Sequence, residues 1–219
     1  MNIAGQKDSG LSQRLLIVYA MAAVLITGSM ACSHINHTSA DAPKAYQTKT
    51  GKTIIVSETH PAGRSLSTIE VRTRGFEHDY QEVYPDRDPI SDVFTADLDG
   101  NGFDEIYIIT TSAGSGSYGT VLGFASNKDK SLSMIHFPGM REGDAHFEGY
   151  MGHDTFKIED QKLVRIFPVY EPGDTNSNPT GGRRKLVYGL VPGEAMWQLR
   201  VEQSEALDGL QDGSRNDAE

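Results

Sequence analysis

Residues 105–125 read EIYIITTSAGSGSYGTVLGFA, in which two apolar runs flank a stretch of glycines and serines. The runs at 105–109 and 120–125 contain the β-branched and aromatic residues that are typical of strands. Between them, Gly114, Gly116 and Gly119 are expected to adopt backbone angles that other residues avoid. The stretch therefore predicts two neighbouring strands joined by a narrow, sharply turned loop.

The loop carries several hydroxyl groups, on Ser115, Ser117 and Tyr118 among others. Tyr118 is a large aromatic residue with a donor hydroxyl at the point where the chain bends. One interpretation is that these hydroxyls project from the domain and hydrogen-bond to another molecule. The alternative is a glycine-rich hairpin turn whose tyrosine folds back onto the sheet.

Further short strand-like runs occur along the rest of the chain, and no long stretch has the helical period. In residues 65–74, Ile69, Val71 and Thr73 alternate with polar residues, which indicates a half-buried strand. Residues 77–89 are charged, contain two prolines and are expected to form a loop. The pattern predicts an all-β fold, an antiparallel sandwich or barrel-like single domain at residues 46–203. The other predicted strands are residues 52–57, 91–96, 131–137, 155–159, 162–170, 183–191 and 196–202.

Both ends of the chain differ in composition from this domain. Residues 1–31 have the charged start, apolar run and small-residue exit of a signal peptide. Cys32 follows Ser-Met-Ala, which suits either lipidation of this cysteine or ordinary cleavage before it. We expect a periplasmic protein of a Gram-negative bacterium, whose only membrane contact is a lipid anchor at Cys32 if one is attached. Residues 32–45 read as a flexible tether and 204–219 as an acidic, disordered tail.

The charge of the chain restricts its partners. Without residues 1–31, the chain has 18 basic and 29 acidic residues. This balance argues against nucleic acid as a partner and favours a cationic one. The single cysteine allows no internal disulfide, so the core must hold the fold together.

Residues 97–105 read DLDGNGFDE and are a candidate calcium site. Asp97, Asp99 and Asn101 occupy alternate positions, with glycine sixth, as in the front half of a calcium loop. The glutamate expected at the twelfth position is replaced by Ile108, so a full EF-hand is excluded, and Asp104 or Glu105 is expected to act as the substitute ligand. The other interpretation is a tight turn rich in Asp, Asn and Gly.

Other site chemistries find less support. His146 and His153 lack the spacing of a familiar zinc site and are expected to be solvated loop residues. Ser115 lies in AGSGS rather than GxSxG, so the nucleophile elbow of an α/β-hydrolase is absent. We therefore expect no enzymatic activity.

Four motifs together resemble the periplasmic inhibitors of invertebrate-type lysozyme. They are DVFTADLDGNG (92–102), SAGSGSYG (112–119), PVYEPGDTN (168–176) and PTGG (179–182), and the resemblance covers residues 46–201. It implies a periplasmic, all-β protein that needs no cofactor and inserts its loop into the active site of a lysozyme. Ser115 and Tyr118 would then be the inhibitory residues, in a loop completed by Ser117 and shaped by Gly114, Gly116 and Gly119. A homodimer remains open.

The main alternative belongs to another class, a calcium-binding envelope interaction or adhesion module organised by residues 97–105. A structural envelope lipoprotein without any effect on lysozyme is a third interpretation. The two functional hypotheses are not exclusive, because a calcium turn before the strand could brace the loop after it.

Overall fold

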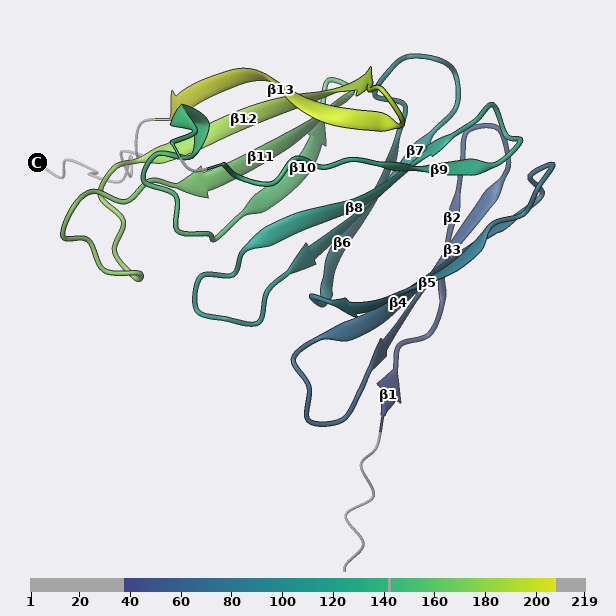
Figure 1. Ribbon diagram of the computed structural model, residues 1–219, viewed down its shortest axis with the longest axis horizontal. Helices are drawn as coiled ribbons and strands as arrows, with labels where there is room; N and C mark the ends of the chain where they lie inside the picture. Colours follow the sequence, from purple (N-terminus) through teal and green to yellow (C-terminus); the bar gives the residue numbers. More distant parts are fainter. Residues whose placement is uncertain (1–37, 142, 208–219) are drawn as a thin grey trace, which may run out of the picture. The chain divides into compact units, whose positions relative to one another are not determined.

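The computed structural model describes residues 38–141 and 143–207, which form thirteen strands in three antiparallel sheets (Figure 1). The helical content of these residues is one 3-10 turn, Ala145–Phe147. The predicted all-β class is confirmed. The predicted signal peptide, Cys32 and residues 208–219 lie outside the described residues.

The first sheet contains β1 (Ser39–Ala40), β2 (Lys44–Gln47), β3 (Thr53–His60), β4 (Ser67–Arg74) and β5 (Gln81–Arg87). Its order is β1-β3-β4-β5, and β2 also pairs with β3. Two predictions are corrected here. Residues 39–40 and 44–45, assigned to the tether, pair with β3, and part of the expected loop at 77–89 is β5. The sequence pattern did not reveal these strands because they lie at sheet edges, are largely exposed and lack apolar alternation. Pro85 favoured a loop, but a proline is tolerated in an edge strand such as β5.

The second sheet is the meander β6 (Ile90–Ala96), β7 (Glu105–Thr111), β8 (Gly119–Ser126) and β9 (Leu132–Ile135). In β7, Ile106 and Ile108 belong to a core shared with the first sheet. Tyr107 and Ile109 point the other way, into a core shared with the third sheet. The run IYII at residues 106–109 is continuously apolar because both faces of this strand are covered.

The third sheet is the meander β10 (Thr155–Glu159), β11 (Lys162–Pro168), β12 (Arg183–Pro192) and β13 (Trp197–Leu207). The predicted boundary of the tail at Ser204 is wrong, because β13 continues to Leu207 and pairs with the start of β12. This end of β13 is exposed and polar, so only its backbone pairing marks it as a strand. The β10–β11 turn holds Asp160 and Gln161 at positive φ, as a two-residue hairpin turn of type I′ requires.

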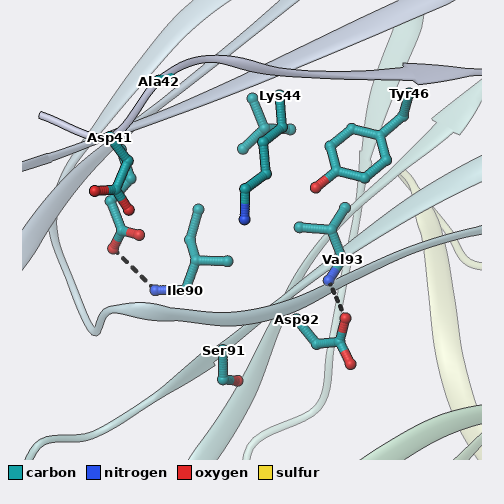
Figure 2. Close-up of a pocket in the computed structure, with 10 residues that line it drawn as sticks. Asp41, Ala42, Lys44, Tyr46, Ile90, Ser91, Asp92 and Val93 are labelled. Carbon is teal, nitrogen blue, oxygen red and sulfur yellow. Dashed lines mark hydrogen bonds between the residues drawn. The ribbon is translucent and has the colours of Figure 1, made fainter.

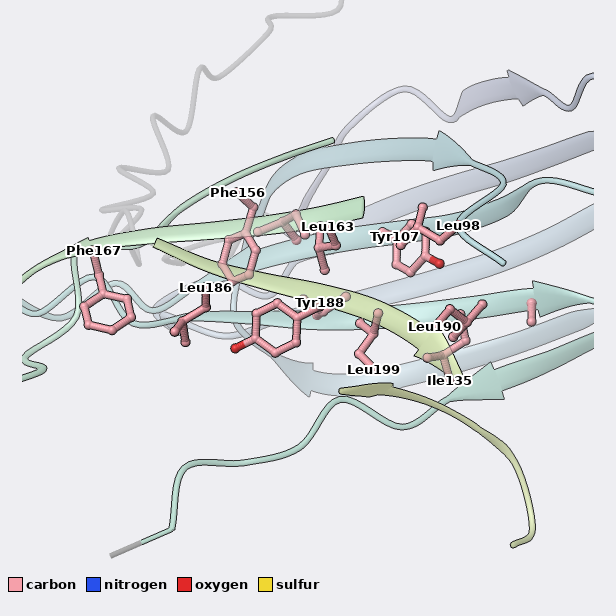
Figure 3. Packing of buried hydrophobic residues seen from close by; sticks show 13 residues of the cluster. Leu98, Tyr107, Ile135, Phe156, Leu163, Phe167, Leu186, Tyr188, Leu190 and Leu199 are labelled. Atoms are coloured by element: carbon pink, nitrogen blue, oxygen red, sulfur yellow. The ribbon is translucent and has the colours of Figure 1, made fainter. Parts of the chain in front are cut away.

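Two apolar clusters hold the sheets together. The larger one joins the second and third sheets, and Figure 3 shows Tyr107, Phe156, Leu163 and Tyr188 within it. His136, just after β9, links the same two sheets through the backbone. Its amide donates to the Trp197 carbonyl at 2.8 Å, and its carbonyl accepts from Leu199 at 2.9 Å. The smaller cluster contains Ile54, Val56, Ile69, Val71, Phe76, Ile106, Ile108, Leu122, Phe124 and Leu132.

Candidate functional site

The segment at residues 112–118, here called the SGSY loop, joins β7 to β8 and is closed by its own hydrogen bonds. The Ser112 amide donates to the Tyr118 carbonyl, and the Tyr118 amide donates to Ser112 Oγ, both at 2.9 Å. Inside this closure the Ser117 amide donates to the Gly114 carbonyl at 3.0 Å. The loop is therefore a defined turn rather than an open connection.

The glycines of the loop have a different role from the one expected. Gly114, Gly116 and Gly119 are not among the residues with positive φ, whereas Ser117 is, at 45°. A Cβ on Gly116 would lie 2.4 Å from the Tyr118 ring, and a Cβ on Gly119 would lie 2.6 Å from the Phe156 ring. Gly114 faces open space. Two of the glycines are thus required by close packing, and the turn angle is supplied by a serine.

The two predicted inhibitory residues are both exposed. Ser115 is exposed and Tyr118 is 45 % exposed, with its ring edge against Tyr150 at a centroid distance of 5.7 Å. Within the described residues, neither Ser115 Oγ nor the Tyr118 hydroxyl has a hydrogen-bond partner. The Tyr118 ring therefore packs against Tyr150 while its hydroxyl donates to none of the described residues.

Two other loops hold the SGSY loop from the side. The His153 amide donates to the Gly116 carbonyl at 2.6 Å, and Asn176 Nδ2 donates to the Ser115 carbonyl at 2.8 Å. His153 and Asn176 also contact each other, at 3.2 Å between Nε2 and Oδ1. The expectation of a solvated His153 is thus wrong, because its half-buried ring belongs to this bracing contact. Gly152 is required beside it, since a Cβ there would lie 1.9 Å from the Gly116 carbonyl oxygen.

A buried ion pair fixes the end of the SGSY loop. Arg165 Nε donates to Asp154 Oδ1 at 2.7 Å, and the side chains are 3 % and 0 % exposed. Asp154 Oδ2 accepts from the Gly119 amide at 2.7 Å and from the Tyr150 hydroxyl. The guanidinium also donates to Tyr150 and to the Gly119 carbonyl. The residue that follows the loop is therefore held through both its amide and its carbonyl.

Aromatic rings enclose the guanidinium of Arg165. Five rings have centroids between 4.9 and 5.9 Å from its central carbon. Burial alone would lower the pKa of Arg165, but the hydrogen bond and charge of Asp154 outweigh it and raise this pKa. The rings favour the charge further through cation–π attraction. They belong to Phe137, Phe147, Tyr150, Phe156 and Phe167.

Sequence reasoning missed this ion pair, although a signal was present. Residues 162–168 read KLVRIFP, and Arg165 lies between Leu163 and Phe167 on the inward face of β11. A charge at an inward position of a strand requires a buried partner of opposite sign. That partner, Asp154, directly precedes β10, the neighbouring strand.

The acidic turn of residues 97–105 is a separate site at the other end of β7. Asp97 and Asp99 accept hydrogen bonds from the Asn101 amide at 3.0 Å each, so the turn is internally bonded. Lys49, from the β2–β3 turn, contacts the Asp97 carboxylate. Burial, with the charges of Asp99 and Asp97, raises the pKa of Glu105 to about 8. The side chain of Asn101, a predicted calcium ligand, is occupied by hydrogen bonds within the turn. It donates to the Asp99 carboxylate and accepts from the Phe103 amide.

A third feature is a pocket of about 330 Å³ where the start of β6 meets β2 and β3 (Figure 2). Its buried Glu58 accepts a hydrogen bond from the Ile90 amide at 2.9 Å. His60 Nε2 lies 3.8 Å from both the Glu58 and Asp41 carboxylates. Figure 2 shows Lys44 extending into this pocket, whose lining also holds Asp41, Glu58 and Asp92.

Comparisons with known proteins give no neighbour from which a role can be transferred. No family model, curated protein or solved structure matches the chain. Within the described residues, no helix has the length and apolar character needed to cross a membrane.

Proposed function

We propose that this protein is a periplasmic lysozyme inhibitor whose SGSY loop enters the cleft of the enzyme. The observation that carries the proposal is the pair of unpartnered hydroxyls, Ser115 and Tyr118, on a loop that is fixed at its base and along one side. The resemblance to inhibitors of invertebrate-type lysozyme names the target. No cofactor takes part in this action.

The chemistry of the target suits these two donors. A lysozyme cleft holds two carboxyl groups that flank the scissile bond, one a general acid and the other ionised. A blocking loop needs hydrogen-bond donors for those oxygens and little bulk in front of them. Ser115 and Tyr118, three positions apart and separated by Gly116 and Ser117, meet both requirements.

The hydroxyls alone would not give tight binding. Hydrogen bonds to charged groups contribute about 1.5–3 kcal/mol each. A nanomolar complex needs about 12 kcal/mol, so further surface must be buried around the loop. The exposed side chains of Met140 and Met151 add apolar area to that of Tyr118 in the loop. Met140 and Tyr118 also line one hollow of about 680 Å³.

Rigidity of the loop supports the same proposal. If the loop of an inhibitor becomes ordered only on binding, each side chain that is immobilised lowers the affinity of the inhibitor for its target. Here the Ser115 and Gly116 carbonyls are already held by Asn176 and His153. The acidic charge of the domain would increase the rate of association with a basic lysozyme, and added salt would reduce this effect.

The test is inhibition of cell-wall lysis by an invertebrate-type lysozyme. The wild-type protein should inhibit, and the Ser115→Ala/Tyr118→Phe double variant should lose at least about tenfold in potency. The matched control is Ser65→Ala/Tyr46→Phe, which removes the same two hydroxyl types from the β3–β4 connection and from β2. Equal potency of the loop variant and the control would contradict the proposal.

A further inference from the structure

We propose that Asp97, Asp99 and Glu105 form a calcium-binding site at the start of β7. The three side chains each place one carboxylate oxygen within 4.8 Å of the others. Asp97 and Asp99 come from the turn before the strand, and Glu105 is the first residue of the strand itself. This inference is independent of the proposed inhibition of lysozyme.

Glu105 supplies the decisive observation. The residue is completely buried, and its Oε2 accepts from the Leu98 amide at 2.8 Å and from the Tyr107 hydroxyl at 3.3 Å. Its Oε1 is buried and has no partner within the described residues. A buried carboxylate oxygen without a partner is unfavourable. A cation shared with Asp97 and Asp99 would satisfy it.

The donor set favours calcium among the common metal ions. All three donors are carboxylates, which hard cations prefer, whereas zinc prefers nitrogen and sulfur. Asp97, Asp99 and Asn101 have the one-three-five spacing of a calcium loop, followed by Gly102 at φ 95°. Magnesium usually binds through one or two carboxylates and keeps several waters, so three converging carboxylates suit it less.

Lys49 is the competing cation. Its Nζ contacts the Asp97 carboxylate and lies 3.9 Å from Asp104. The side chain is 43 % exposed and flexible, so it can turn to solvent when an ion binds. Replacing Lys49 with methionine should therefore tighten calcium binding, because the ammonium no longer has to leave Asp97.

The site and the SGSY loop lie at opposite ends of β7. The strand Glu105–Thr111 has seven residues, which corresponds to about 20 Å of extended chain. Any effect of calcium on the SGSY loop would therefore have to pass along the whole of β7. Calcium is expected to stabilise the fold without changing inhibition.

The experiment is thermal unfolding of the protein in chelator, in about 10 mM calcium and in about 10 mM magnesium, a range that suits the weak sites of extracellular modules. Calcium should raise the midpoint by about 2–6 °C, and magnesium should raise it by less than half as much. The isosteric Glu105→Gln variant should lose most of the calcium shift. Asp104→Asn, which removes the same charge from the same turn, should keep it.

Direct binding provides the second readout. Terbium replaces calcium at oxygen sites, and Tyr107, which donates to Glu105, is placed to sensitise its luminescence. Calcium should displace terbium from the wild-type protein, and Lys49→Met should need several-fold less calcium for the same displacement. The absence of a calcium shift in the wild-type protein would overturn the proposal. So would an equal shift with magnesium, or an undiminished calcium shift in Glu105→Gln.

Discussion

The buried carboxylate of Asp154 accepts a hydrogen bond from the amide of Gly119 at 2.7 Å. Asp154 directly precedes β10 of the third sheet, whereas Gly119 is the first residue of β8 in the second. Through this contact the Arg165–Asp154 ion pair at the margin of the larger core fixes the point where the SGSY loop returns to its sheet. Stability of the domain and geometry of the loop thus depend on one carboxylate.

Replacing Asp154 with asparagine should therefore lower the free energy of unfolding by about 3–5 kcal/mol, because Arg165 is left buried without a counter-charge. Denaturant unfolding measures this change. The control is Glu202→Gln in the exposed Lys162–Glu202 pair, which should change stability by less than about 1 kcal/mol. A loss at Asp154 no larger than at Glu202 would argue against a structural role for the buried pair.

Gly116 and Gly114 should respond differently to alanine. A Cβ on Gly116 would collide with the Tyr118 ring and approach the Met151 carbonyl at 3.1 Å, so the alanine displaces Tyr118 from its position. We expect Gly116→Ala to reduce inhibitory potency by at least about tenfold while the unfolding midpoint falls by only a few degrees. Gly114→Ala has open space around it and should leave the midpoint unchanged. Similar midpoints and potencies for the two variants would contradict this account of the loop.

Asn176 should affect inhibition by holding the SGSY loop in place, without itself contacting the lysozyme. Its amide donates to the Ser115 carbonyl, and its side-chain oxygen meets His153. Asn176→Ala removes both contacts, so the free loop becomes more mobile and must be ordered on binding. Hydrogen exchange at the Ser117 and Tyr118 amides should quicken, and inhibition should weaken several-fold. Unaltered exchange at these amides would show that Asn176 does not brace the loop.

Acidification should loosen the loop of residues 171–180 that carries Asn176. The amides of Glu171 and Thr180 donate to Asp174, and these bonds hold the pKa of that carboxyl below its usual value. Because the folded pKa is depressed, the stabilisation is present above the unfolded pKa of about 4 and is lost as the pH falls through the lower folded value. Exchange protection of the Thr180 amide should decrease over that range. In Asp174→Asn the protection should no longer depend on pH there.

Much of this fold is readable from the sequence, because most strands have an apolar face. Residues 65–74 show the alternation that β4 uses, and the run at 105–109 is a fully buried strand. The failures lie at sheet edges. β5 and the end of β13 are held by backbone pairing and expose most of their side chains, so they carry no apolar pattern.

The candidate site was only half predictable. The composition of residues 110–119 marks the loop, and its hydroxyls are local features of the sequence. The supports are not local, since Asp154 lies 35 positions from Gly119 and Asn176 lies 61 from Ser115. Such contacts depend on how the third sheet meets the second. Only Arg165, a charge on an inward face, indicated that a buried partner was needed.

The most direct test of the proposed inhibition is a double-mutant cycle between Tyr118 and the catalytic acid of an invertebrate-type lysozyme. Binding would be measured for the wild-type inhibitor and Tyr118→Phe, each against the enzyme and its variant with the catalytic acid changed to the amide. If the tyrosine hydroxyl meets that carboxyl group, the two changes should be non-additive by about 1–3 kcal/mol. Additivity within about 0.5 kcal/mol, or no binding to the wild-type enzyme, would contradict the account.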